Sequence, residues 1–200
     1  MSTAVPVLSR TPAPAIVAIG ASAGAVDALG HILPQLLPTF PVPVLIVVHV
    51  PADRRSALPA LFGRTCAVAT AEAEDKMRPE PSTVYFAPPD YHLLVETDGS
   101  LALSVDDAVN HSRPSIDVLF ESVATVYGPR SLGILLSGAS RDGADGLARI
   151  RDAGGQTWVQ APDTAQMAVM PRAALALAPH VIADPRSIGL ALAAWSDTGD

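Results

Sequence analysis

The sequence predicts a three-layer α/β/α fold, in which helices cover both faces of a mostly parallel sheet of about seven strands. Two observations lead to this prediction. Short apolar runs rich in β-branched residues alternate along the chain with segments of helical periodicity, the pattern of repeated strand–helix units. Several of these runs are apolar at every position, as expected for parallel strands that are covered on both faces.

Seven short apolar segments are expected to form the sheet. They are residues 15–19, 44–50, 66–70, 83–87, 132–136, 157–160 and 180–183. A β-hairpin is expected beside them in the stretch HLLVETDGSLALSV, because Asp98-Gly99 between two apolar runs favours a tight turn.

The clearest helix is the stretch PSIDVLFESVATVYG, in which apolar residues recur at helical spacing. Pro114 suits its first turn and Gly128 suits its end. Three further helices are expected, each with one apolar face. The first follows Ser22 with Val26, Leu29, Ile32 and Leu33, the second follows Asp142 with Leu147 and Ile150, and the last begins near Asp184 with Ile188, Leu190, Leu192 and Trp195.

The chain shows no internal repeat and no linker, so one domain is expected over residues 15–196. Residues 1–14 hold three prolines and no periodic pattern, which predicts a flexible lead-in, and residues 197–200 are expected to form a tail. Trp158 and Trp195 are expected in the core.

Composition excludes several classes of function. The chain has 13 Lys and Arg against 20 Asp and Glu, a formal net charge of −7, whereas a nucleic-acid binder needs a basic face. Cys66 is the single cysteine, which excludes a disulfide framework and a thiolate metal site. The five histidines form no ligand pattern, so no metal and no cofactor are expected.

The sequence also predicts a cytoplasmic protein without an integral membrane segment. Its N-terminal residues lack the charged and apolar regions of a signal peptide. The longest apolar stretch, residues 42–51, is interrupted by proline and histidine and is too short to cross a bilayer.

Gly20-Ala21-Ser22-Ala23-Gly24 is a G-x-S-x-G motif that comes directly after the first predicted strand. His49 ends the second strand, and Asp142 follows the strand at 132–136. Because the carboxyl ends of parallel strands meet at one edge of a sheet, these side chains are expected together. A serine, an imidazole that takes its proton and a carboxylate that orients the imidazole are the parts of a nucleophilic triad.

Each member also has a purely structural interpretation. Serine and aspartate are common helix N-caps, so Ser22 and Asp142 could each be a cap. A histidine on an apolar strand, such as His49, is often a core residue. Asp145 is a competing carboxylate, one turn into the predicted helix.

Two other folds share parts of this motif and fit less well. In an α/β-hydrolase the triad follows the order Ser, Asp, His, whereas the order here is Ser22, His49, Asp142. In a dinucleotide site a third glycine and an acidic end of the second strand are expected, whereas Ala25 and His49 stand here.

Residues 16–195 resemble the catalytic domain of the CheB-type chemotaxis receptor methylesterases. The matching stretches occur in the order and spacing of that family. They are IGASAGA, VVHVP, YFAPPDYHLLV, SRPSIDVLFESVA, LLSGASRDGADGL and AVMPRAAL.

The resemblance implies a triad of Ser22, His49 and Asp142 that hydrolyses γ-glutamyl methyl esters on chemoreceptors and releases methanol. Deamidation of receptor glutamines is a further activity of some members. The methyl-accepting chemoreceptors are the implied partners, with a separate receiver or methyltransferase as a regulatory partner, because only about 14 residues precede the first strand. A degenerate binding module and an esterase for another ester are the alternatives.

Further residues are candidates for the oxyanion or substrate site. Backbone N–H groups at the start of the helix after Ser22, and in the turn before Asp142, are expected to face a developing oxyanion. Arg113 and Asp117 could order the site or bind substrate, although a surface cap pair is the favoured alternative, and Met170 is expected to shape the site by packing. The candidates for the oxyanion are Ala23, Gly24, Ser137, Gly138 and Ala139.

The sequence departs from the family pattern at three positions. Ala25 stands where a second glycine is usual, which adds a methyl group close to the serine motif. Ala139 and Arg141 stand where the family commonly has methionine and asparagine. Arg141 could lower activity, alter the choice of substrate or point to solvent.

Overall fold

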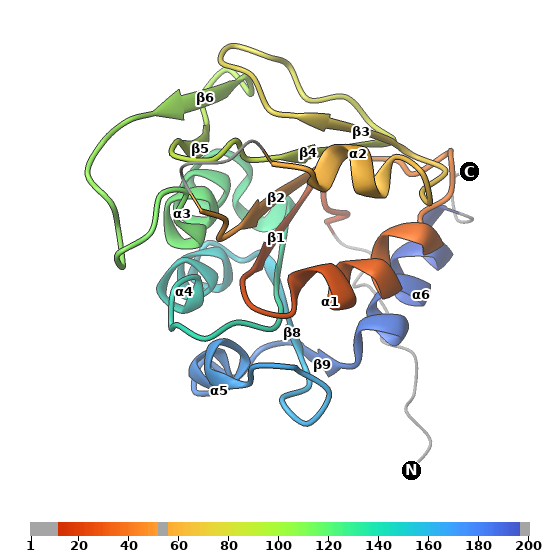
Figure 1. Cartoon of the computed structure of the whole chain (residues 1–200), viewed down its shortest axis with the longest axis vertical. Coiled ribbons are helices and arrows are strands. Elements are labelled where there is room, and N and C mark those ends of the chain that lie inside the picture. Colours follow the sequence, from red (N-terminus) through yellow and green to blue (C-terminus); the bar gives the residue numbers. More distant parts are fainter. Residues whose placement is uncertain (1–11, 52–55, 197–200) are drawn as a thin grey trace.

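A seven-stranded parallel sheet forms the middle layer of the computed structural model, which describes residues 12–51 and 56–196 (Figure 1). The strand order is β3-β4-β2-β1-β7-β8-β9, and β5 and β6 pair separately as an antiparallel hairpin. The strands are β1 (Ile16–Ala21), β2 (Val44–Val48), β3 (Ala69–Glu72), β4 (Thr83–Phe86), β5 (His92–Val95), β6 (Leu101–Ser104), β7 (Ser131–Leu135), β8 (Gln156–Gln160) and β9 (Val181–Ala183).

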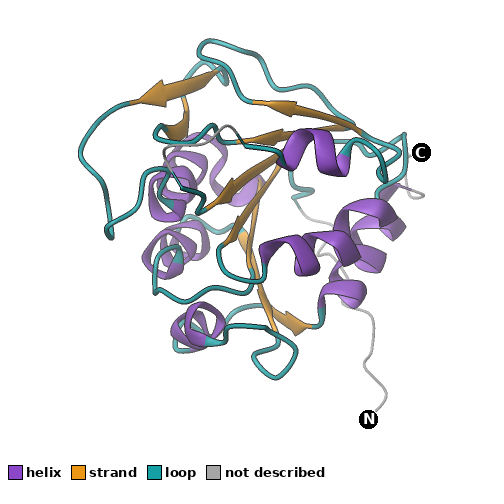
Figure 2. Cartoon of the chain, viewed as in Figure 1, coloured by secondary structure: helices purple, strands orange, loops and turns teal. Residues whose placement is uncertain are grey.

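Helices lie on both faces of the sheet (Figures 1 and 2). One face packs against α1 (Ala25–Ile32), α2 (Leu58–Phe62), α6 (Pro185–Ser196) and the short 3₁₀ helix Leu33–Gln35. The other packs against α3 (Ile116–Tyr127), α4 (Ala144–Asp152) and α5 (Val169–Leu175), and a second 3₁₀ turn, Gly128–Arg130, precedes β7. The predicted three-layer fold with its hairpin is therefore confirmed.

The strands alternate their side chains between two apolar cores. Val17 and Ile19 of β1 face the α1 and α6 layer, whereas Ile16 and Ala18 face the α3 and α4 layer. Because β1 is covered on both sides, every one of its residues is buried, which explains its unbroken apolar sequence. Trp158 is fully buried and Trp195 packs against the first core, as predicted.

The central position of β1 explains where a site can form. Its neighbours are β2 on one side and β7 on the other, both parallel to it. The chain therefore adds β2 on one side of β1 and later adds β7 on the other side. The loops after β1, β2 and β7 consequently meet at one edge of the sheet. Ser22, His49 and Asp142 follow these three strands.

Several details differ from the predictions. The helices α2 and α5 were not predicted, because they are short and each contains a proline in its sequence. The strand predicted at 66–70 begins only at Ala69. Val26 and Leu190 were expected to be buried and are 53% and 38% exposed. The inner face of α1 is formed by Ala25, Ala28, Leu29 and Ile32, and that of α6 includes Ile188, Ala191 and Leu192.

Parts of the predicted lead-in and the whole predicted tail, residues 1–11 and 197–200, lie outside the described residues. Over the ranges 12–51 and 56–196, no helix is both long and apolar enough to cross a membrane.

Candidate active site

Ser22 lies directly after β1 in the turn that leads to α1. Its backbone N–H donates to the Ser137 carbonyl at 2.9 Å, which ties the turn to the end of β7. Gly24, with φ of 85°, is the left-handed residue of the turn and the N-cap of α1, and no side chain caps this helix. Ser22 is therefore not a helix cap. Its half-buried hydroxyl makes no hydrogen bond to any residue in the described part of the chain.

His49 lies one residue beyond β2 and next to Ser22 in the sheet register. Ala21 is aligned with Val48, and the His49 N–H donates to the Ala21 carbonyl at 3.2 Å. The imidazole Nε2 lies 2.7 Å from Asp142 Oδ2. Because an ionised carboxylate only accepts hydrogen bonds, Nε2 carries the proton and Nδ1 is left as the basic nitrogen.

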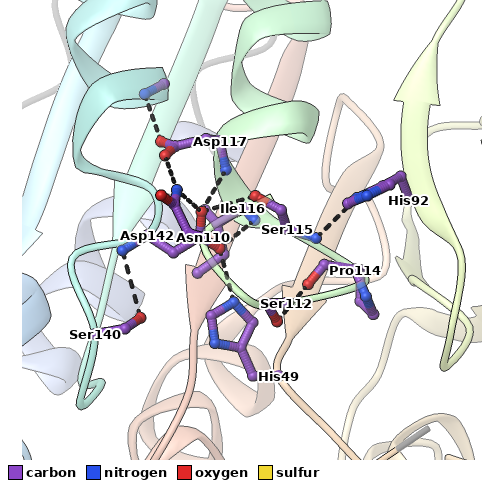
Figure 3. Close-up of polar contacts among 11 residues, drawn as sticks. His49, His92, Asn110, Ser112, Pro114, Ser115, Ile116, Asp117, Ser140 and Asp142 are labelled. Carbon is purple, nitrogen blue, oxygen red and sulfur yellow. Dashed lines mark hydrogen bonds and ion pairs between the residues drawn. The ribbon is translucent and has the colours of Figure 1, made fainter. Parts of the chain in front are cut away.

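Asp142 lies in the loop between β7 and α4 and is fully buried. Besides His49, its Oδ2 accepts the Ile116 N–H at 2.7 Å. Its Oδ1 accepts the Ser115 hydroxyl at 2.7 Å and the Asn110 amide at 2.9 Å (Figure 3). Asp142 thus caps the N-terminus of α3 from a different segment, and this fixes the direction in which it faces His49.

Asp117, in the first turn of α3, caps α4 in return. Its Oδ1 accepts the Gly146 N–H at 2.6 Å, and its Oδ2 accepts the Asn110 amide at 2.7 Å. The Asp117 N–H lies 3.3 Å from Asp142 Oδ1. Asp142, just before α4, therefore caps α3, and Asp117, in the first turn of α3, caps α4. Asn110 lies between the two carboxylates (Figure 3).

The two carboxylates have opposite pKa shifts. Burial raises the pKa of Asp142, but hydrogen bonds from His49, Asn110, the Ile116 N–H and Ser115 outweigh it and lower this pKa from 3.8 to about 2. Burial, followed by the negative charges of Asp142 and Asp145, raises the pKa of Asp117 to about 6, against hydrogen bonds from Gly146 and Asn110. Asp142 is consequently ionised at neutral pH, as an orienting carboxylate must be.

The candidate backbone donors divide into occupied and available groups. The Ser137 N–H donates to Gln160 Oε1 at 2.8 Å, and the Gly138 N–H donates to the Met167 carbonyl at 3.0 Å. Both are therefore already used, and the expectation that they serve an oxyanion is corrected. The N–H groups of Ala23, Gly24 and Ala139 have no acceptor among residues 12–51 and 56–196.

Arg113 and Asp117 do not form the expected surface pair. Asp117 is 5% exposed and holds α4, whereas Arg113 binds Asp90 Oδ1 with its Nε and Nη2, at 2.9 and 2.7 Å. Arg113 Nη1 also donates to the carbonyls of Val105 and Asp106. Its guanidinium thus fastens the loop before α3.

Met170 is fully buried, and its backbone N–H donates to the Gly138 carbonyl at 3.0 Å. A Cβ on Gly138 would lie 2.5 Å from the Met170 methyl group, so the two residues pack without space between them. This packing supports the loop that carries Ala139, and a buried Met170 offers no surface to a substrate.

Two of the three departures from the family pattern, Ala25 and Arg141, have local explanations. The Ala25 methyl group is buried in the apolar core, so it does not enter the space beside Ser22. Arg141 is exposed and pairs with Asp145 at 2.9 Å, and this pair directs both side chains into solvent. Asp145 is thereby removed as a competitor of Asp142.

Sequence reasoning missed three polar residues of the site: Asn110, Ser115 and His92. His92 is buried; its Nδ1 accepts the Ser115 N–H at 3.1 Å, and its Nε2 lies 3.1 Å from the Asp107 carbonyl. The stretch SRPSIDVLFESVA did contain Ser115, but its position next to Pro114 indicated a helix start, not a bond to Asp142.

Among the residues that the structure describes, no three His, Cys, Asp or Glu side chains are grouped so as to hold a metal ion. The site contains a serine hydroxyl, an imidazole bonded through Nε2 to an ionised buried carboxylate, and N–H groups at the start of α1 that find no acceptor within the described ranges. These are the parts required for acyl transfer through serine.

Comparison with known proteins shows the family to which the chain is similar. A family model described as CheB methylesterase matches residues 17–192. A protein of Leptospira interrogans is 43% identical over 159 residues, covering 80% of this chain and 82% of the relative. A Treponema pallidum protein described as protein-glutamate methylesterase/protein-glutamine glutaminase is 42% identical over 166 residues, and the match spans 41% of its length. The crystal structure of the Thermotoga maritima CheB methylesterase catalytic domain matches with a TM-score of 0.87 at 27% identity, covering 92% of this chain and 99% of that one.

Proposed function

The chain belongs to the CheB methylesterase family, and we propose that Ser22, His49 and Asp142 are its catalytic triad. The family and the names of the relatives indicate that the reaction is the hydrolysis of protein glutamate methyl esters, as in the adaptation of chemoreceptors. The observation that supports the residue roles is the 2.7 Å bond between His49 and the buried Asp142, at the strand position next to Ser22.

In this proposal His49 Nδ1 takes the Ser22 proton as the hydroxyl attacks the ester carbonyl. The tetrahedral oxyanion is stabilised by the N–H groups of Ala23, Gly24 and Ala139, which are unpaired within the described ranges. His49 then returns its proton to methoxide, methanol leaves, and a γ-glutamyl ester of Ser22 remains. Water activated by the same nitrogen hydrolyses this ester and restores the serine.

Asp142 takes no proton during this cycle. Its low pKa keeps it ionised, so it holds the Nε2–H tautomer and stabilises the imidazolium that forms when His49 is protonated. Arg113, proposed from the sequence for substrate binding, instead supports the loop before α3, and Met170 supports the loop of Ala139.

The proposed substrates are methyl-accepting chemoreceptors, with receptor glutamine as a second substrate, because the relatives from Leptospira interrogans and Treponema pallidum are described as protein-glutamine glutaminases as well. A separate receiver protein or a methyltransferase as regulatory partner, and a cytoplasmic location, remain predictions. The alternative of a binding module without turnover is less well supported, because Asp142 and His49 are paired despite the departures from the family pattern at Ala25, Ala139 and Arg141.

The test is methanol release from methyl-labelled receptor membranes, with three proteins compared: the parent, Ser22→Ala and Ser104→Ala. Release is expected from the parent and from Ser104→Ala, whose hydroxyl bonds Asp106 on the surface, and is expected to be lost in Ser22→Ala. Equal release from Ser22→Ala contradicts the proposed nucleophile. Absence of release from a folded parent favours the binding module or another ester.

A further inference from the structure

The loop between β6 and α3 brings one side chain, Asn110, into the buried carboxylate cluster. Val109 and Ser112 exchange backbone hydrogen bonds of 3.2 and 2.9 Å, and the two residues between them, Asn110 and His111, have φ of 52° and 62°. Both central residues of such a two-residue turn need a left-handed backbone conformation, and asparagine adopts this conformation more readily than most residues do. The residues of the turn, Asn110 included, are exposed, and the Asn110 amide nitrogen points to the two carboxylates (Figure 3).

The base of this loop is fastened on both sides. The Arg113 guanidinium donates to the carbonyls of Val105 and Asp106 at 2.7 and 3.0 Å, and to the Asp90 carboxylate. The His92 ring bonds the Asp107 carbonyl before the turn. These contacts fix the direction from which Asn110 approaches the site.

The Asn110 amide nitrogen uses both of its hydrogens on carboxylates. It donates to Asp117 Oδ2 at 2.7 Å and to Asp142 Oδ1 at 2.9 Å. The nitrogen, rather than the amide oxygen, must face them, because a carboxylate oxygen only accepts. A neutral double donor between two acidic groups offsets their repulsion without adding charge.

We propose that Asn110 is a positioning residue for the hydrolysis, holding the Asp142 carboxylate in the orientation in which Oδ2 accepts the His49 Nε2–H. The inference rests on the proposed triad, since Asn110 is proposed to act through its bond to Asp142. Asn110 shares Oδ1 with the Ser115 hydroxyl and the Asp117 N–H, both at the start of α3, while His49 and Ile116 occupy Oδ2. Loss of Asn110 removes the Oδ1 donor that comes from outside α3, so the carboxylate can rotate towards the donors of that helix. Asp117 fixes the other hydrogen of the amide and so fixes the plane of the amide itself.

The first test compares Asn110→Gly with His111→Gly. Both variants keep a residue that accepts positive φ and add the same backbone freedom to one turn, but only the first removes the double donor. In methanol release from methylated receptors, Asn110→Gly is expected to lower kcat by about 10- to 100-fold and to leave KM within about twofold, since a hydrogen bond to a charged group is lost. His111→Gly is expected to keep both constants.

The second readout does not depend on turnover. The proton on His49 Nε2 should give a low-field NMR resonance in the parent and in His111→Gly, because it is held in a 2.7 Å bond to a carboxylate. In Asn110→Gly this resonance should shift upfield or disappear. Should Asn110→Gly not fold, Asn110→Asp keeps the left-handed residue and exchanges the donor for a carboxylate, and the same two losses are expected.

The outcomes separate the two proposals. A fall in kcat together with the change in resonance supports the positioning role. Unchanged kcat, or a fall in kcat with an unchanged resonance, overturns it. If the parent releases no methanol while Asn110→Gly still alters the resonance, the proposed function fails and the positioning of Asp142 by Asn110 stands; an unaltered resonance there overturns it.

Discussion

The Asp117 carboxylate accepts the Gly146 N–H at 2.6 Å, so the first turn of α3 caps the first turn of α4. The reverse contact, from Asp142 to the Ile116 N–H at 2.7 Å, involves the carboxylate that orients His49. The junction of α3 and α4 is therefore built from the same side chains as the site. Stability of this junction and geometry of the site should change together.

Replacing Asp117 with alanine is expected to destabilise the fold. The change leaves the buried Gly146 N–H and one of the two Asn110 amide hydrogens without an acceptor, which costs about 1–3 kcal/mol. Urea unfolding measures the loss. Asp145→Ala is the control, because Asp145 is an exposed acid in the first turn of α4, and it should cost less than about 1 kcal/mol. Equal losses in the two variants would show that the buried cap contributes nothing beyond charge.

The stability of the parent should depend on the titration of Asp117. Its pKa is raised from 3.8 to about 6 on folding, so its protonated form favours the folded state. This contribution is fully present below pH 3.8 and is lost as the pH rises through about 6. The lowered pKa of Asp142 acts in the opposite sense, with stability present above pH 3.8 and lost as the pH falls through about 2.

Asp117→Asn isolates the first of these contributions, since asparagine does not titrate in this range. The free energy of unfolding of the parent relative to Asp117→Asn should therefore decrease between pH 4 and pH 6 and stay level above pH 7. Chemical unfolding at a series of pH values gives this difference. A difference that does not change with pH would contradict the raised pKa.

Gly24 should not tolerate a side chain. It has φ of 85°, and a Cβ there would lie 2.7 Å from Ser137 Oγ and 2.8 Å from Gln166 Cβ. Gly24→Ala is expected to destabilise the protein by more than about 1 kcal/mol and to reduce activity, because the strained turn carries Ser22. Gly30→Ala is the matched control within α1: nothing lies within 4 Å of the added methyl group, and stability should rise by about 0.5–1 kcal/mol. Thermal unfolding of Gly24→Ala, Gly30→Ala and the parent measures both changes in stability.

Asp142→Asn is expected to lower kcat by roughly 10⁴-fold, less than loss of Ser22 or His49, because Asp142 orients the base and does not react. Asparagine has one acceptor oxygen where Asp142 uses two, so its amide nitrogen must face either His49 and Ile116 or Ser115 and Asn110. Steady-state rates measure the effect. Full activity of the folded variant would remove Asp142 from the proposed triad.

The fold and the position of the site could be predicted from the sequence because they depend on local patterns. The unbroken apolar run of β1 and the periodicity of α3 each reflect burial on particular faces. Ser22, His49 and Asp142 could be placed together because each follows a strand of one parallel sheet.

The contacts that orient Asp142 could not be predicted, because they depend on where remote segments meet. Asn110 lies in an exposed turn with no periodic pattern, and its bonds to Asp117 and Asp142 span 7 and 32 residues. The use of Gly138 as a donor to Met167 likewise depends on the packing of the loop before α5. The short helices α2 and α5 could not be predicted for a different reason: each contains a proline, which weakens the helical pattern of a short segment.

The most direct test of the central claim is covalent labelling of the serine with a fluorophosphonate, followed by peptide mass spectrometry. The account predicts one adduct, on Ser22, in the parent, with no adduct in Ser22→Ala and labelling at least about 100-fold slower in His49→Ala, because the hydroxyl is then unactivated. An adduct on a different residue, or labelling of Ser22 at the same rate without His49, would contradict the account.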